Sequence, residues 1–190
     1  GGGRYVFTSA PPASGTVTLG WAGAHGIPDL APVPNAFGGG AWGYTLSPGL
    51  VRDVVINEIL ADNLTSLADE DDQKQDWIEL RNRGGSAVSL QGWSLTDDPA
   101  LPGKWVLPNL TLAAGQYLVI FASGKNRATT TPGTTNHVSF QLPVGGGYLG
   151  LFNANLPRQV ASQFSPEYPE LRGNISYGLK ASGAPAWFST

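Results

Sequence analysis

The chain contains no cysteine and no methionine. Without cysteine it forms no disulfide, binds no metal through thiolates and has no cysteine nucleophile, and the redox state of its compartment is left open. The lack of methionine, even at position 1, predicts that the sequence is a module taken from a longer chain. Any function inferred from it therefore belongs to a module.

Long apolar runs and a surplus of basic residues are also missing. No run of about 18 apolar residues and no signal-type apolar segment is found, so the sequence predicts no membrane-spanning helix. The formal net charge is −3, and the 11 basic residues are scattered along the chain. This pattern disfavours binding to a phosphate backbone. We therefore expect neither a nucleic acid nor a membrane as a partner.

Glycine, proline and apolar residues are abundant. Glycine (26) and proline (15) are frequent while charged residues make up only 13% of the chain, a balance typical of short strands joined by tight turns. Apolar residues account for 41% of the 190 positions, which is enough to build a real core. The composition predicts an all-β protein.

The pattern of the chain changes near residue 50. Residues 15–23 alternate like a strand, and residues 41–46 do the same. Because so few strands cannot close a sandwich, we interpret residues 1–50 as a short extra N-terminal β segment and linker. This segment would be the end of a preceding module. The alternative is that these strands pack on the main domain.

Residues 51–190 carry strand signals at short spacing, separated by turns rich in glycine and proline. This spacing is typical of an antiparallel β-sandwich with one core. Ile78 and Leu80 are expected to share one face of their strand, and Trp77 and Glu79 the opposite, outward face. The nine predicted strands are residues 53–60, 76–82, 87–90, 92–97, 104–108, 116–123, 137–142, 147–153 and 158–164.

Two patterns associated with nucleotide binding and catalysis fail on context. Gly38, Gly40 and Gly43 match G-x-G-x-x-G, but strand-like sequence follows where that motif needs the N-terminus of a helix. A serine nucleophile needs a histidine within reach, and the chain has only His25 and His137, with no G-x-S-x-G turn. The sequence therefore predicts no catalytic residues and no enzyme.

Carboxylates gather between residues 58 and 79. One interpretation is a solvated loop whose charges keep strand edges from pairing with other chains. A second is a calcium site, since calcium requires carboxylate and carbonyl oxygens, although the spacing does not match an EF-hand. A third and weaker one is an acid–base pair across a cleft. The candidate calcium ligands are Asp62, Asp69, Asp71, Asp72 and Asp76.

The tryptophans near these carboxylates form a second candidate site. Trp77 and Trp105 are candidates for stacking on sugar rings or bases. Trp93, which follows Gly92 at an expected strand kink, is expected to pack in the core. The alternative for Trp77 and Trp105 is that they also complete the core.

Several short motifs, taken together, resemble one known family. They are Ile56-Asn57-Glu58, Asp76-Trp77-Ile78-Glu79-Leu80, Gly92-Trp93 and the stretch from Leu112 to Val119. From about residue 51 to residue 164 the chain resembles the lamin tail domain, as found in large bacterial secreted and surface proteins. The resemblance implies an immunoglobulin-like β-sandwich and a mainly architectural role for the motif at residues 76–80. Residues 1–50 look like the end of a bacterial immunoglobulin-like repeat.

The resemblance implies less about activity, because no catalytic set belongs to that family. It implies a non-catalytic interaction or structural module, an accessory part of a multidomain protein located outside the cell or on its surface. Such a module would bind protein or surface ligands. The alternative is a carbohydrate-binding module that recognises a cell-surface glycan and holds calcium in the acidic loop. In both cases we expect a monomeric module with no cofactor other than that calcium.

Overall fold

The computed structural model describes residues 15–20, 41–46 and 53–189. All regular structure in these ranges is β-strand, with no helix among them, which confirms the predicted all-β class. None of the described residues belongs to a helix long and apolar enough to cross a membrane.

The chain divides into two compact units, residues 1–49 and residues 50–190. In the first unit, β1 (Gly15–Gly20) pairs antiparallel with β2 (Ala41–Leu46) along its whole length. Both strands occur where the alternation of apolar and polar residues predicts them.

The glycine pattern of the first unit ends in a strand rather than a helix. Gly43 lies within β2, which confirms the strand expected after the pattern. Gly38, Gly40 and His25 lie outside the described residues.

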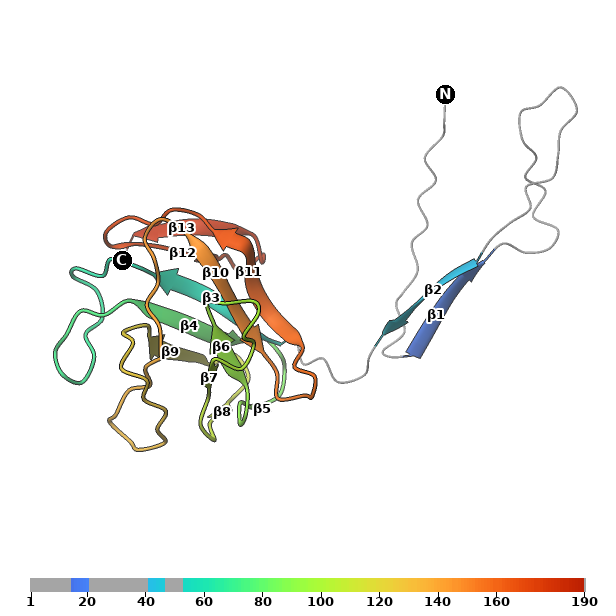
Figure 1. Cartoon of the computed structure of the whole chain (residues 1–190), viewed down its shortest axis with the longest axis horizontal. Helices are drawn as coiled ribbons and strands as arrows, with labels where there is room; N and C mark the ends of the chain where they lie inside the picture. Colours follow the sequence, from blue (N-terminus) through green and yellow to red (C-terminus); the bar gives the residue numbers. More distant parts are fainter. Residues whose placement is uncertain (1–14, 21–40, 47–52, 190) are drawn as a thin grey trace, which may run out of the picture. The chain divides into compact units, whose positions relative to one another are not determined.

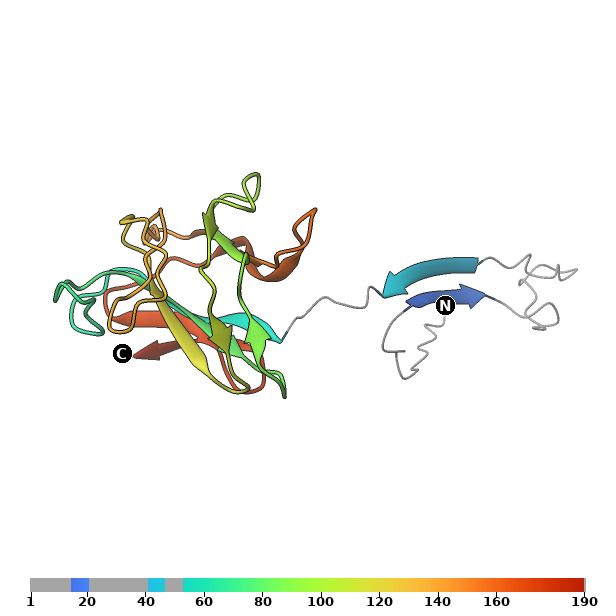
Figure 2. The same ribbon diagram turned by 90° about the horizontal axis from the view of Figure 1, so that it is seen from below.

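The second unit is an immunoglobulin-like sandwich of two antiparallel sheets (Figure 1). Its strands are β3 (Val54–Leu60), β4 (Trp77–Asn82), β5 (Val88–Ser89), β6 (Ser94–Thr96), β7 (Trp105–Val106), β8 (Thr111–Leu112), β9 (Tyr117–Phe121), β10 (Gly147–Phe152), β11 (Val160–Tyr168), β12 (Ile175–Leu179) and β13 (Pro185–Ser189). One sheet has the order β13-β12-β3-β4-β9 and the other β11-β10-β6-β7, while β5 pairs with β8. Figure 2 shows the C-terminal strand β13 at the rim of the sandwich.

The core lies between the two large sheets. Ile78 and Leu80 of β4 are fully buried and pack in one cluster with Leu95 of β6 and Leu149 and Leu151 of β10. The side chains on one face of β4 therefore meet the facing sheet, as the alternation along this strand predicts.

Four elements differ from the sequence prediction. β8, β12 and β13 are strands that the pattern did not indicate. Residues 137–142, predicted to be a strand, form only isolated bridges, at His137 and at Gln141. The apolar side chains of this segment nevertheless face the interior at every second position, because Val138, Phe140 and Leu142 are buried. The backbone hydrogen bonds of Val138 and Phe140 go to the end of β9 and to the loop after it.

A β-bulge in β3 fixes the position of Asn57. The pairing with β4 shifts between Ile56 and Glu58, so Asn57 is the extra residue, and its Nδ2 donates to Oε1 of Glu79 at 2.7 Å. On the other edge of β3, Gly178 of β12 pairs with Glu58, and a Cβ at Gly178 would collide with the carbonyl oxygen of Asn57. A glycine is needed here because two backbones approach closely.

Replacing Gly178 by alanine should lower the free energy of unfolding by about 1–3 kcal/mol, because the added methyl group must push β12 away from β3. Gly85→Ala is the matched control, since a Cβ at this exposed turn residue meets nothing within 4 Å. Urea denaturation of the two variants measures the difference. Equal midpoints would show that the two strands separate without cost.

Candidate functional site

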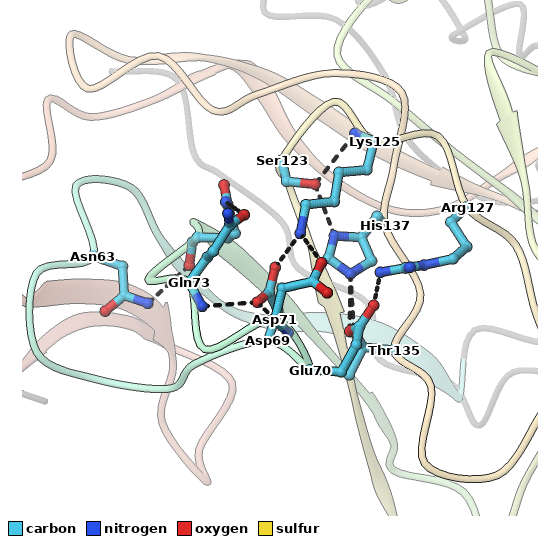
Figure 3. A network of polar contacts seen from close by, with 11 residues as sticks. Asn63, Asp69, Glu70, Asp71, Gln73, Ser123, Lys125, Arg127, Thr135 and His137 are labelled. Atoms are coloured by element: carbon cyan, nitrogen blue, oxygen red, sulfur yellow. Dashed lines mark hydrogen bonds and ion pairs between the residues drawn. The ribbon is translucent and has the colours of Figure 1, made fainter.

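A network of polar side chains joins the acidic loop after β3 to the loop after β9 (Figure 3). The first loop supplies carboxylates, and the second supplies cationic, hydroxyl and imidazole groups. We call it the acid–histidine network. Its members are Asp69, Glu70, Asp71, Ser123, Lys125, Arg127, Thr135 and His137.

Two buried polar side chains shape the acidic loop. Nδ2 of Asn63 donates to two backbone carbonyls of the same loop, at 2.7 and 2.8 Å. Oδ1 of Asp69 accepts the backbone N–H groups of Asp71 and Gln73, at 3.0 and 2.9 Å. Asn63 and Asp69 are each only 5% exposed. The loop is therefore folded around side chains that replace its missing backbone partners.

Lys125 connects this loop to the second one. Its Nζ donates to Oδ2 of Asp69 at 2.6 Å and to Oδ2 of Asp71 at 2.7 Å. Burial tends to raise the pKa of Asp69, but Lys125 and two backbone N–H groups lower it more strongly, so this pKa lies below its usual value. The same two carboxylates raise the pKa of Lys125. The ammonium of Lys125 therefore occupies the space between the two carboxylates.

His137 lies at the centre of the network and has no exposed surface. Its ring stacks on Phe121, with 5.4 Å between the ring centroids and 25° between the planes. Nδ1 lies 2.7 Å from Oγ of Ser123. Nε2 lies 2.8 Å from Oγ1 of Thr135 and 3.3 Å from Oε2 of Glu70. Both ring nitrogens thus have a hydrogen-bonding partner.

The surroundings of His137 keep its ring neutral at neutral pH. Burial, followed by the positive charges of Arg127 and Lys125, lowers its pKa from the ordinary 6.5 to about 4, against the opposing effect of the aspartates of the network. Glu70, whose carboxylate faces Nε2, is itself paired with Arg127. The imidazole is therefore held as a neutral hydrogen-bonding group.

A serine, a histidine and a glutamate stand in hydrogen-bonding order here. Oγ1 of Thr135 donates to Oε2 of Glu70 and can therefore only accept from Nε2–H of His137. Nδ1 of the neutral ring then accepts from the hydroxyl of Ser123. In serine hydrolases the serine bonds to Nε2 and the acid to Nδ1. This ring has the opposite orientation and is sealed from solvent, which favours a structural link over a nucleophile.

The structure separates the five aspartates predicted to bind calcium. Asp69 and Asp71 meet at the lysine ammonium, whereas Oδ1 of Asp76 accepts the backbone N–H of Asp62 at 2.8 Å. Asp62 and Asp72 are exposed. Over the described ranges, no three acidic or histidine side chains are arranged to hold a metal ion. The predicted ligands do not converge, because their carboxylate oxygens accept hydrogen bonds from a lysine and from backbone N–H groups.

The two tryptophans predicted to stack on a ligand are buried. Trp77, 5% exposed, packs in a small cluster with Leu60 and Phe121, and Trp105, 3% exposed, packs in the main core. The stacking prediction is wrong for both rings because other side chains cover them. Trp77 does lie on the face opposite Ile78, but that face is covered rather than open. Trp93 packs in the core as predicted.

An exposed tryptophan lies in a pocket that the sequence analysis did not consider. Glu170, Arg172, Ile175 and Trp187 line this pocket, whose volume is about 410 Å³. We call it the Trp187 pocket. Trp187 is 46% exposed, and residues 185–189 carry no alternating apolar pattern that could have indicated it. The pocket therefore exposes an aromatic ring to solvent beside two charged groups.

Two antiparallel sheets that enclose one core place the second unit in the class of immunoglobulin-like domains. Within that class, a family model described as Lamin Tail Domain matches residues 50–163. The chain belongs to the lamin tail domain family, and the resemblance expected over residues 51–164 is confirmed. A comparison with curated proteins finds no match. The match ends before β12, β13 and the Trp187 pocket.

Replacing His137 should make the free energy of unfolding less dependent on pH in the acidic range. The unfolded chain takes up a proton at this residue near pH 6.5 and the folded chain only near pH 4. The free energy of unfolding of the wild type should therefore fall as the pH drops through this window, by on the order of 2 kcal/mol from this residue. Urea denaturation at several pH values should show a weaker dependence for His137→Gln.

Other groups do not mimic this effect. The pKa of Asp69 is lowered, so this residue loses its contribution to the free energy of unfolding only at more acidic pH. The half-buried carboxyls Asp76 and Glu79 have raised pKa values. They titrate in the wild type and in the variant alike, so they do not contribute to the difference between the two curves. Parallel curves for the wild type and the variant would contradict the assignment of a neutral, buried His137.

Calcium should leave the thermal unfolding midpoint unchanged. A cation bound only by the folded state would raise the midpoint by mass action, but the ammonium of Lys125 already lies between Asp69 and Asp71. The measurement is a thermal scan with millimolar calcium, with EDTA, and with sodium chloride at matched ionic strength. A rise that only calcium produces, and that EDTA removes, would restore the calcium site.

Proposed function

We propose that this chain is a non-catalytic interaction module of a larger multidomain protein that acts outside the cytoplasm. Membership of the lamin tail domain family, whose fold is an immunoglobulin-like interaction module, supports this function. The partner would be a protein or a surface ligand, and the chain would act as a monomer.

The observation that carries this proposal is that the charged side chains of the acid–histidine network pair with one another. Lys125 is paired with Asp69 and Asp71, and Arg127 with Glu70. General acid–base catalysis needs a group that reaches the substrate and whose pKa lies near the working pH. His137 is sealed and has a pKa of about 4. The network therefore suits a structural role better than proton transfer.

The network links two loops of the module through ion pairs. Lys125 lies 56 residues from Asp69 and 54 from Asp71 along the chain, so the ion pairs join two loops that are distant in the sequence. Loops fixed before binding lose less conformational entropy when a partner binds. A surface held in this way supports recognition without a reaction.

The competing function is hydrolysis by Ser123, because its hydroxyl lies within hydrogen-bonding distance of His137, which in turn faces Glu70. The test compares the wild type with Ser123→Ala on nitrophenyl esters, phosphates and glycosides. Ser86→Ala, at an exposed serine outside the network, is the matched control. We expect the three proteins to give the same background rate.

The non-catalytic proposal fails if the wild type and Ser86→Ala turn over a substrate that Ser123→Ala does not. Circular dichroism of the three proteins ensures that a lost rate does not reflect unfolding.

A further inference from the structure

The Trp187 pocket combines an exposed indole with two charged side chains of opposite sign. Trp187 comes from the edge strand β13, while Glu170 and Arg172 come from the segment that joins β11 to β12. Ile175, at the start of β12, adds apolar surface. Such a mixture of apolar wall and a few polar groups is typical of small-ligand sites, and about 410 Å³ is within their usual size.

The indole of Trp187 is held in place by other aromatic rings. Its centroid lies 5.0 Å from that of Tyr177, which in turn lies 5.5 Å from that of Phe164. Tyr177 and Phe164 pack against the main core. The ring is thus supported from within the fold while 46% of the residue stays exposed. A supported aromatic ring binds a ligand with little loss of its own freedom.

The two charged groups of the pocket have unused hydrogen-bonding capacity. Neither the carboxylate of Glu170 nor the guanidinium of Arg172 makes an ion pair or side-chain hydrogen bond with another residue of the described ranges. The carboxylate only accepts and the guanidinium only donates, whereas a hydroxyl group does both. A neutral ligand with neighbouring hydroxyls can satisfy both groups. An ionic ligand would be attracted by one and repelled by the other.

We propose that the Trp187 pocket binds a neutral sugar ring of a glycan. The apolar C–H face of the ring packs on the indole of Trp187, and its hydroxyls donate to Glu170 and accept from Arg172. This inference rests on the proposed non-catalytic interaction function, to which it adds a class of ligand and a site.

A peptide that adds a strand to the free edge of β13 is the competing occupant. Strand addition depends mainly on backbone hydrogen bonds and side-chain pockets along the edge. It would not require a donor and an acceptor of opposite charge beside one indole. These two groups therefore favour the sugar.

A glycan array with neutral and acidic oligosaccharides, probed with the labelled chain, tests the inference. We expect the wild type to bind neutral glycans and Trp187→Ala to bind them about tenfold more weakly or not at all. Trp187→Phe should restore part of the binding. Tyr117→Ala is the matched control and should bind like the wild type, since Tyr117 is 51% exposed and lies on β9 at the opposite edge of the same sheet.

Two further variants examine the polar groups. Glu170→Gln and Arg172→Gln remove one charge each and keep much of the side-chain shape, so each should weaken binding while the thermal midpoint stays unchanged. They keep the test informative if Trp187→Ala does not fold.

The sugar inference is overturned by an array without bound neutral glycans, or by neutral-glycan binding that Trp187→Ala and the two glutamine variants retain. Peptides selected from a display library that need Trp187, together with a blank array, would assign the pocket to a peptide instead. These results are independent of the hydrolysis assay with Ser123→Ala. An array with no bound glycan therefore contradicts the sugar inference but not the proposed non-catalytic function.

Discussion

The register between β3 and β4 is the constraint on which the rest of the sandwich depends. Successive side chains of a strand point to opposite faces, so a slip of one residue would turn Ile78 and Leu80 out of the core. The bulge at Asn57 introduces such a shift within β3, and the hydrogen bond to Glu79 holds it in place. The asparagine and acidic residues of these two strands thus serve the architecture of the sheet.

The prediction from sequence succeeded where local periodicity determines the structure. The alternation at Ile78 and Leu80 indicated the buried face, and Trp93 packs in the core as expected. β12 was missed although its apolar residues Ile175, Tyr177 and Leu179 alternate. It contains Gly178, a residue type that weakens a strand pattern, and β3 requires that glycine. The two-residue strand β8 is too short for any period to be visible.

The candidate sites were harder to predict because they depend on long-range contacts. Nothing near Asp69 in the sequence indicates that Lys125 will neutralise it. Trp77 was expected to face outward, and its burial depends on Phe121, the residue on which His137 stacks. An acidic loop and a tryptophan suggested a ligand site, but distant residues convert both into internal packing.

The ion pairs of Lys125 also restrict how this module can vary. An insertion in the acidic loop would carry Asp69 and Asp71 away from the ammonium, and an insertion before Lys125 would have the same effect from the other side. Because Asp69 is buried, a change in one loop leaves its charge uncompensated unless the other loop adjusts. The lengths of the two loops are therefore coupled, and viable changes in them should arise in pairs.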